Sequence, residues 1–148
     1  MVSGLYFEEF EPGAKYVSQG RTVTEADVVA FAALSCDYNP LHTDARFAAT
    51  TPFGERIAHG MLTVAISTGM SNWTGIFAGT TIALVEQNIK YTGAVKFGDT
   101  VHLEMEVIEK KETSKPDRGI INFAARMLND AEQVVVDMKW TLLMKRKS

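Results

Sequence analysis

The sequence predicts an α+β fold in which one long helix is followed by an antiparallel sheet. Residues 60–74 form an almost wholly apolar helical segment, which is typical of a helix at the centre of a protein. After this segment the apolar residues recur at every second position, which is the period of a strand. Short turns separate the successive strands, and such connections favour antiparallel neighbours.

Composition limits the class of protein. The 148 residues are 46% apolar and 22% charged, and the formal net charge is −3. This balance disfavours nucleic acid as a partner, because phosphate binding needs a basic surface. The single cysteine excludes an internal disulfide. We expect one domain covering residues 1–148, since a chain of this length can bury a core by itself.

The chain is expected to open with a strand at residues 14–22, followed by a helix. Two capping boxes are possible at the start of this helix. One pairs Thr22 with Glu25, and the other pairs Thr24 with Asp27. The helical spacing predicts one buried face, which consists of Val28, Phe31, Ala32 and Ser35.

The first helix is expected to end near Cys36, because the residue before Pro40 avoids helical geometry. Asp44 can cap a short helix that runs through Ala49. Residues 51–54 form a loop before the long helix.

Residues 60–85 contain no charged side chain, a length that suggests a membrane span. Threonine, serine, asparagine and glycine interrupt the segment, so we interpret it as a buried helix, a loop and the start of a strand. Residues 1–9 lack the features of a signal peptide, and we expect a cytoplasmic protein that does not bind membranes. The basic residues 145–147 are expected to be a solvated tail.

The second half predicts strands with one apolar face each. The predicted inward residues are Ala83, Val85, Ile89 and Tyr91, with Gln87 as the exception; then Val101, Leu103, Met105 and Val107; then Ile121, Phe123, Ala125 and Met127; and finally Val134, Val136, Met138, Trp140, Leu142 and Met144.

The segment 37–42 gathers polar residues that can perform chemistry. Asp37 and His42 lie five residues apart across a turn that contains proline, and such a turn can aim both side chains at one point. A carboxylate and an imidazole that converge on one water form a general acid/base pair. Asn39 offers an amide that can brace the loop. The spacing alone leaves a structural role open, with Asp37 as a turn residue and His42 as a structural histidine.

A second candidate lies at the start of the long helix. Gly60 follows His59, and the first N–H groups of a helix have no partner within the helix. Such an N–H can stabilise negative charge on a carbonyl oxygen. His59 itself is expected to orient the loop or to be structural.

Three segments carry a resemblance to a known family. Residues 31–48, with the core Asp37-Tyr-Asn39-Pro-Leu-His42, resemble the signature of MaoC-like, (R)-specific enoyl-CoA hydratases. Residues 57–62 and 91–100 are similar to later segments of that family. The resemblance implies the hot-dog fold, a curved antiparallel sheet around a long central helix. It also implies a homodimer with the site near the interface.

The resemblance implies a role for each site residue. Asp37 and His42 correspond to the catalytic pair that holds the attacking water, and Asn39 supports this pair. The N–H of Gly60 corresponds to the group that polarises the thioester carbonyl. Thr68 stands where some members have a serine near the acyl group. The implied reaction converts a trans-2-enoyl-CoA into an (R)-3-hydroxyacyl-CoA reversibly. No metal or separate cofactor is expected, because coenzyme A is part of the substrate.

The chain departs from the family pattern at three positions. Cys36 precedes the aspartate where many members have a small residue, commonly glycine, and Ala94 replaces a common proline. We expect both changes to be silent. Thr68 bears on the acyl pocket and therefore on substrate choice.

Three alternatives to hydration stay open. Hot-dog acyl-CoA thioesterases usually carry a carboxylate on the central helix, and residues 60–74 contain none. A cysteine hydrolase would pair Cys36 with His42, but adjacent residues point in different directions, and the anion of Asp37 would raise the pKa of the thiol. A non-catalytic acyl-CoA binding protein would bind the ligand without changing it.

Some features of the substrate remain open in the sequence. Ile66, Met70, Trp73 and Phe77 can line a short acyl pocket or fill the core. The candidates for contact with the CoA phosphates are Arg46, Lys90 and Lys96.

Overall fold

The computed structural model describes residues 4–147, so residues 1–3 and 148 of the expected domain lie outside it. The signal-peptide expectation rests in part on those first residues. The elements are, in chain order, η1 (Phe7–Glu9), β1 (Lys15–Val17), β2 (Arg21–Thr22), α1 (Glu25–Ser35), α2 (Pro40–Thr43), α3 (Ala45–Ala49), α4 (Gly60–Trp73), β3 (Thr81–Tyr91), β4 (Thr100–Glu112), β5 (Arg118–Leu128) and β6 (Val134–Lys145).

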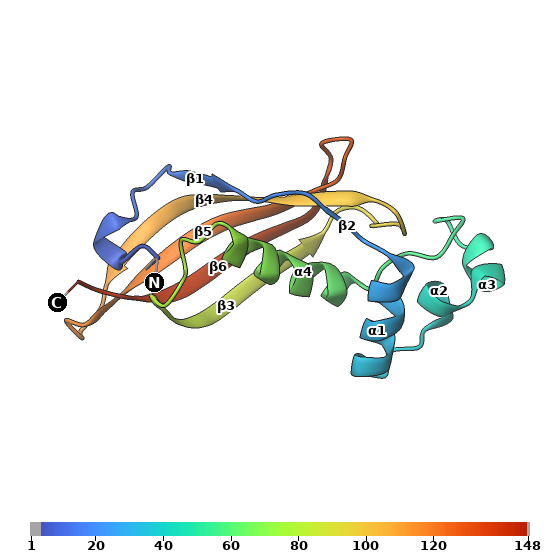
Figure 1. The fold of residues 1–148 in the computed structure, drawn as a ribbon, viewed down its shortest axis with the longest axis horizontal. Helices are drawn as coiled ribbons and strands as arrows, with labels where there is room; N and C mark the ends of the chain where they lie inside the picture. The colour runs from blue at the N-terminus through green and yellow to red at the C-terminus, as the bar shows by residue number, and fades with distance from the viewer. Residues whose placement is uncertain (1–3, 148) are drawn as a thin grey trace.

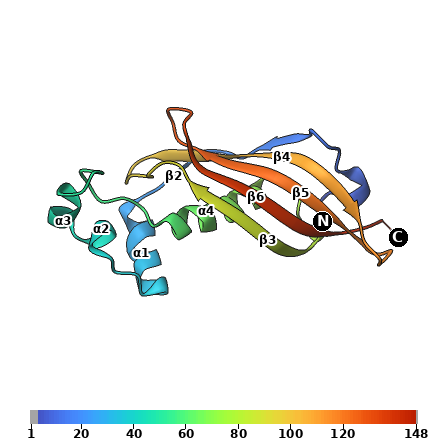
Figure 2. The ribbon, with the colours of Figure 1, turned by 180° about the vertical axis from the view of Figure 1, so that it is seen from behind.

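The strands form one antiparallel sheet with α4 along one face (Figure 1). The strand order is β1-β4-β5-β6-β3, and β2 also pairs with β4. Both views show that α1, α2 and α3 project beyond one end of the sheet (Figures 1 and 2). We call residues 25–59 the overhang. The predicted class, α+β with an antiparallel sheet around one long helix, is confirmed.

The three central strands follow the predicted alternation. Every predicted inward residue of β4 and β5 is buried, and so are Val136, Met138, Trp140, Leu142 and Met144 of β6. Val134 is only half-buried. Strands β4 and β5 extend beyond the predicted ranges, because their outer ends pair with each other beyond the buried core.

The edge strand β3 corrects a prediction. Ala83 and Val85 were expected on the inward face, but both are exposed. The register shifts between Leu84 and Glu86, so Leu84 is paired with buried Leu142 while Gln87 is paired with buried Trp140. An extra residue in one strand switches the side of the sheet that later side chains face. The uniform alternation predicted for this strand is therefore wrong.

The predicted opening strand 14–22 is divided into two short strands. Both β1 and β2 pair with β4, but residues 18–20 leave the ladder. The hydroxyl of Ser18 accepts a hydrogen bond from the N–H of Leu103 at 2.9 Å, in the place of a main-chain carbonyl. A side chain that replaces a backbone acceptor interrupts a strand.

The first helix uses the second of the two predicted capping boxes. The Thr24 hydroxyl accepts from the Asp27 N–H, and the Asp27 carboxylate accepts from the Thr24 N–H at 2.9 Å. Val28 and Ala32 are buried as predicted, whereas Phe31 is half-buried and Ser35 is exposed. The helix ends at Cys36, which adopts left-handed geometry with φ 60°.

The long helix α4 forms where predicted, but one side of it is open. Leu62, Val64, Ile66 and Met70 are buried, whereas Met61 and Trp73 are 57% and 55% exposed. A single sheet can cover only one side of a helix, so the expectation of a helix buried all round is wrong for this chain. No helix among residues 4–147 is long and apolar enough to cross a membrane.

The basic C-terminal segment is not the solvated tail that we expected. Arg146 contacts the carboxylates of Glu8 and Glu112, and Lys147 pairs with Glu9 at 2.6 Å. The Arg146 guanidinium also lies 5.0 Å from the ring centre of Phe7. These contacts fasten the end of the chain to η1.

Candidate functional site

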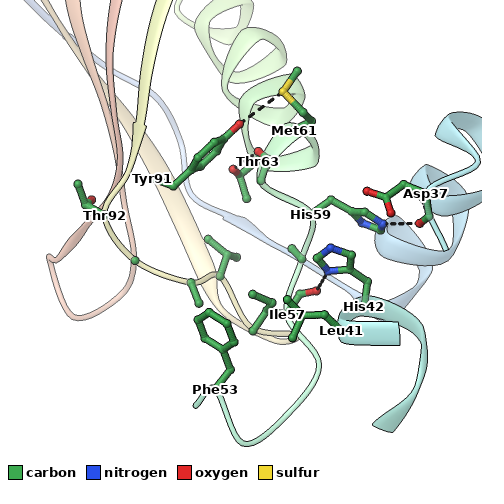
Figure 3. Close-up of a pocket in the computed structure, with 15 residues that line it drawn as sticks. Asp37, Leu41, His42, Phe53, Ile57, His59, Met61, Thr63, Tyr91 and Thr92 are labelled. Atoms are coloured by element: carbon green, nitrogen blue, oxygen red, sulfur yellow. Dashed lines mark hydrogen bonds between the residues drawn. The ribbon is translucent and has the colours of Figure 1, made fainter. Parts of the chain in front are cut away.

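A cavity of about 560 Å³ lies where the overhang meets the start of α4 and the end of β3 (Figure 3). Its walls combine a few polar groups with an apolar surface, which is typical of a small-molecule site. The lining residues are Asp37, Leu41, His42, Phe53, Ile57, Ala58, His59, Gly60, Met61, Thr63, Tyr91, Thr92, Gly93, Ala94 and Val95.

Three polar side chains converge at one side of this cavity. One carboxylate oxygen of Asp37, one ring nitrogen of His42 and one ring nitrogen of His59 lie within 4.8 Å of one another. Two hydrogen bonds of about 2.8 Å each can span such a separation through one water. The structure therefore brings together Asp37 and His42, as the sequence predicted, and adds His59 to the group.

Local hydrogen bonds shape the turn that carries Asp37 and His42. The Asn39 side chain caps α2 by accepting from the Leu41 N–H at 3.0 Å. The main-chain N–H of Asn39 donates to the Asp37 carboxylate at 3.2 Å. Asn39 thus braces the loop through its side chain and holds the carboxylate through its backbone.

The tautomer of His42 follows from its contact with the loop before α4. Nδ1 lies 2.7 Å from the carbonyl oxygen of Ile57. A carbonyl oxygen only accepts, so Nδ1 carries the proton. The neutral ring then has its lone pair on Nε2, which is the arrangement of a general base.

His59 locks the same turn from the other side. Its Nε2–H donates to the main-chain carbonyl of Asp37 at 2.9 Å. The two histidine rings pack against each other, with centres 3.9 Å apart and planes tilted by 30°. Phe31 packs on the His59 ring at 5.0 Å between ring centres. The expectation that His59 orients the loop agrees with these contacts.

Gly60 opens α4 at the wall of the cavity, directly against Tyr91. A side-chain carbon at Gly60 would lie 2.7 Å from Cε1 of Tyr91, which is closer than any such contact can be. The Tyr91 hydroxyl donates to the sulfur of Met61 at 3.4 Å. Glycine at this position therefore leaves room for the tyrosine ring, and its N–H lies at the free N-terminus of the helix.

Two predicted site residues do not line this cavity. Asn39 is linked to it through its hydrogen bond to Asp37, and the other is Thr68. Thr68 lies two turns further along α4 and lines a separate cavity with Ser71 and Trp140. Thr63 occupies the corresponding place near Gly60, and its hydroxyl donates to the Gly60 carbonyl at 2.6 Å. An i, i+3 spacing from Gly60 was the signal that could have identified Thr63.

The structure also places Cys36, the alternative nucleophile, and the three candidates for contact with the CoA phosphates. Cys36 is exposed and is not among the residues that line the cavity. Lys96 forms an ion pair with Glu55 at 2.6 Å, and this hydrogen bond raises the pKa of Lys96. Among residues 4–147, Arg46 and Lys90 have no carboxylate within 4.0 Å.

The predicted acyl-pocket residues are divided between core and surface. Ile66, Met70 and Phe77 belong to the buried core, whereas Trp73 is exposed. Tyr91 and Phe53 line the cavity instead. Tyr91 follows Gly60 by 31 positions, and no local spacing in the sequence connects the two residues.

The group formed by Asp37, His42 and His59 also has the spacing of a metal-binding set. However, His42 Nδ1 and His59 Nε2 already donate to main-chain carbonyls. An ion would have to use a carboxylate oxygen, His42 Nε2 and His59 Nδ1, and the last atom is fully buried. The expectation of no metal stays a prediction.

The comparisons with known proteins agree on one family. Residues 8–125 match the MaoC-like domain. The chain is 35% identical over 105 residues to 3-hydroxybutyryl-CoA dehydratase of Methylorubrum extorquens, covering 71% of this chain and 65% of that protein. It is 36% identical over 111 residues to the (R)-specific enoyl-CoA hydratase of Aeromonas caviae, covering 75% of this chain and 78% of that protein.

Some relatives are longer than the aligned part. The chain spans 65% of the length of the Methylorubrum protein and 33% of protein MaoC from Klebsiella aerogenes. Activities and substrates of those whole proteins therefore enter below as proposals.

Solved structures give the same result. The R-hydratase of Pseudomonas aeruginosa superposes with a TM-score of 0.79 at 36% identity, covering 99% of this chain and 89% of that one. The R-hydratase of A. caviae gives a TM-score of 0.76 at 31% identity, covering 95% and 99%. A double hot-dog protein from Mycobacterium tuberculosis shares the fold at 18% identity, with a TM-score of 0.86 over 99% of this chain and 46% of that one. The chain thus has the hot-dog fold and belongs to the MaoC-like hydratase and dehydratase family.

Proposed function

We propose that this protein adds water to a trans-2-enoyl-CoA and releases an (R)-3-hydroxyacyl-CoA, in a reversible reaction. The observation that carries the proposal is the convergence of Asp37 and His42 in a cavity that also contains the first turn of α4. Relatives named as (R)-specific enoyl-CoA hydratases and 3-hydroxybutyryl-CoA dehydratase support it.

Asp37 and His42 hold the attacking water. The neutral His42 ring presents the Nε2 lone pair, because Nδ1–H is bound to Ile57. The oxygen of the water adds to C3 while one of the pair takes its proton, and a proton is returned to C2 on the same face. A positioned acid/base group contributes about 10²–10⁴-fold to a rate.

The start of α4 supplies the second catalytic contribution. The Gly60 N–H donates to the thioester oxygen and stabilises the negative charge that develops there when water adds. One such donor contributes about 10²–10³-fold. The helix dipole and the free N–H groups at this position both stabilise negative charge on the oxygen.

We also propose that two copies assemble through the β3 edge. Ile82, Leu84 and Val85 on this strand are 39%, 41% and 61% exposed. An exposed apolar sheet edge is a template for pairing with another strand. A two-fold axis would pair this edge with the same edge of the second copy, so that both edges are covered. Light scattering at micromolar concentration should give the mass of a dimer, and the mass of a single chain would contradict this assembly.

The test is a hydration assay with short trans-2-enoyl-CoA thioesters. The loss of the enoyl absorbance measures the rate, and chiral analysis identifies the product. We expect loss of absorbance and an (R)-3-hydroxyacyl product. Release of free thiol without hydration would identify a thioesterase. Binding of the thioester with no change in absorbance would identify a non-catalytic acyl-CoA binding protein.

A further inference from the structure

His59 lies between two parts of the site that come from different segments of the chain. The turn 37–42 carries the acid/base pair, whereas the N–H of Gly60, the proposed oxyanion donor, opens α4. His59 is the N-cap residue of α4, and it is only 2% exposed. The proposed reaction gives no task to this buried histidine, although its ring touches the turn and its backbone begins the helix.

The main chain next to His59 is fixed to the body of the molecule. The N–H of Ala58 donates to the carbonyl oxygen of Val95 at 2.8 Å, and Ile57 forms an isolated antiparallel bridge with Lys96. Ile57 and Ala58 are also buried, at 8% and 4% exposure. The segment that leads into α4 therefore has a firm position from which a side chain can reach the turn.

The side chain of His59 crosses from this segment to the turn (Figure 3). Its Nε2–H donates to the main-chain carbonyl of Asp37 at 2.9 Å, and its ring packs on His42 with ring centres 3.9 Å apart. The other nitrogen, Nδ1, is buried and has no partner among residues 4–147. A second proton there would be buried without an acceptor, so the ring is a neutral group whose single N–H goes to the turn.

The shape of the substrate explains why such a contact is needed. In an enoyl thioester the carbonyl group is conjugated with the C2–C3 double bond, so the unit is planar and C3 lies at a fixed distance from the thioester oxygen. The donor on α4 and the water held by the turn must therefore be in register with each other. A misplacement of about 1 Å in such a geometry can cost on the order of 100-fold in rate.

We propose that His59 is a positioning residue, whose hydrogen bond to the Asp37 carbonyl keeps the acid/base pair in register with the Gly60 N–H. The inference rests on the proposed hydratase function, because both groups act on the same thioester. In this role His59 transfers no proton. It acts through the main chain of Asp37 and the ring of His42.

Two substitutions separate the hydrogen bond of His59 from the packing of its ring. His59→Gln keeps an N–H near the position of Nε2 but removes the ring. His59→Phe keeps a ring against Phe31 and His42 but removes the donor. With trans-2-butenoyl-CoA, kcat should fall by about 10- to 100-fold in His59→Phe and by less in His59→Gln. The KM should change little in both, because the lost contacts are not made to the substrate.

Thermal unfolding distinguishes this role from a purely structural one. His59→Phe should melt closer to the unmodified protein than His59→Gln, because it still fills the buried space and Asp37 is exposed to water that can replace the donor. We therefore expect opposite orders for the rates and the melting temperatures of the two variants. A rate in His59→Phe equal to or above that in His59→Gln would overturn the proposal, since ring packing alone would then be sufficient.

The matched control is Val64→Ala in the same helix. Val64 is 3% exposed and does not line the cavity. Its truncation should lower the melting temperature and leave kcat near that of the unmodified protein. A loss of kcat in Val64→Ala as large as in His59→Phe would overturn the specific role of His59, because any weakening of α4 would then have the same effect.

A second measurement keeps the inference testable apart from the activity. If the unmodified protein hydrates no enoyl thioester, the proposed function falls, and proton NMR of the histidine ring N–H groups decides the positioning contact. The Nδ1–H of His42, bound to Ile57, should exchange with solvent faster in His59→Phe than in His59→Gln or in the unmodified protein. Equal exchange in all three proteins would overturn the contact as a determinant of the turn.

Discussion

The sheet and the overhang are held together by different forces. Every second residue is buried over residues 100–107 of β4 and residues 118–127 of β5, so the sheet depends on apolar burial. In the overhang α2 has no buried residue, and α1 and α3 together bury only Val28, Ala32 and Ala48. Hydrogen bonds from caps and from two histidines hold that region instead. Apolar burial in the sheet therefore supplies most of the stability, whereas the residues of the proposed chemistry lie in a segment that polar contacts hold in place.

The largest expected effect tests the overhang. Asp37→Asn and His42→Ala should each lower the hydration rate by about 10²–10⁴-fold, because each removes one of the two groups that hold the water. The melting temperature should stay within a few degrees of the unmodified protein, since both side chains lie outside the core. Steady-state kinetics and thermal unfolding measure the two quantities.

Two variants serve as controls for this prediction. Asp44→Asn keeps an N-cap on α3 within the same overhang, and His102→Ala removes a histidine on β4. Neither residue lines the cavity, and both variants should retain near-normal turnover. Near-normal turnover in Asp37→Asn or His42→Ala would contradict the assigned roles.

The second prediction tests the sheet. Leu103→Ala should lower the free energy of unfolding by about 2–5 kcal/mol, because Leu103 is fully buried in the core and its removal leaves a cavity. Denaturant unfolding measures this quantity. Ile108→Ala on the same strand is the control, since Ile108 is 44% exposed and its truncation should cost much less. Equal losses of unfolding free energy from the two substitutions would show that burial does not determine the contribution of a side chain on this strand to stability.

The third prediction tests the junction of the two regions. Gly60→Ala should reduce kcat by about 10–100-fold, because the new methyl group collides with the Tyr91 ring and displaces the helix start. Adding Tyr91→Ala should restore part of the rate by making room for the methyl group. Gly69→Ala is the control, since a methyl group there meets no atom within 4 Å among the described residues. No restoration in the double variant would argue against steric displacement.

The smallest expected effect concerns acid stability at the end of the sheet remote from the site. Although burial disfavours the charge of Glu8, hydrogen bonds from Lys147 and Arg146 lower its pKa from 4.5 to about 2. A carboxylate with a depressed pKa stabilises the fold above pH 4.5, and this contribution is lost as the pH falls toward 2.

Glu8→Gln removes that contribution and provides the measurement. The Glu8 side chain is 35% exposed, so solvent screening limits the expected loss to about 1 kcal/mol or less near neutral pH. The difference in unfolding free energy between the two proteins should shrink as the pH is lowered through this range. A difference that is constant with pH would contradict a role for the Glu8 charge.

Much of the site could be predicted because its key contacts are local. Asp37, Asn39 and His42 lie within six positions, and the cap and the turn that orient them involve the same few residues. The strands β4, β5 and β6 were equally predictable, since each has one buried and one exposed face. By contrast, the bulge in β3 follows from its pairing with β6, and no residue within β3 predicts it.

The amino-acid sequence was enough to predict the fold class, the central helix, the family resemblance and the pair formed by Asp37 and His42. Four features became visible only in the folded chain: the tautomer of His42, the packing of His59 on its ring, the close approach of Gly60 to Tyr91, and the position of Thr68 in a second cavity. Distance along the chain explains this division. Periodicity and capping act between neighbours, whereas these four features depend on segments that meet only when the sheet and helix pack.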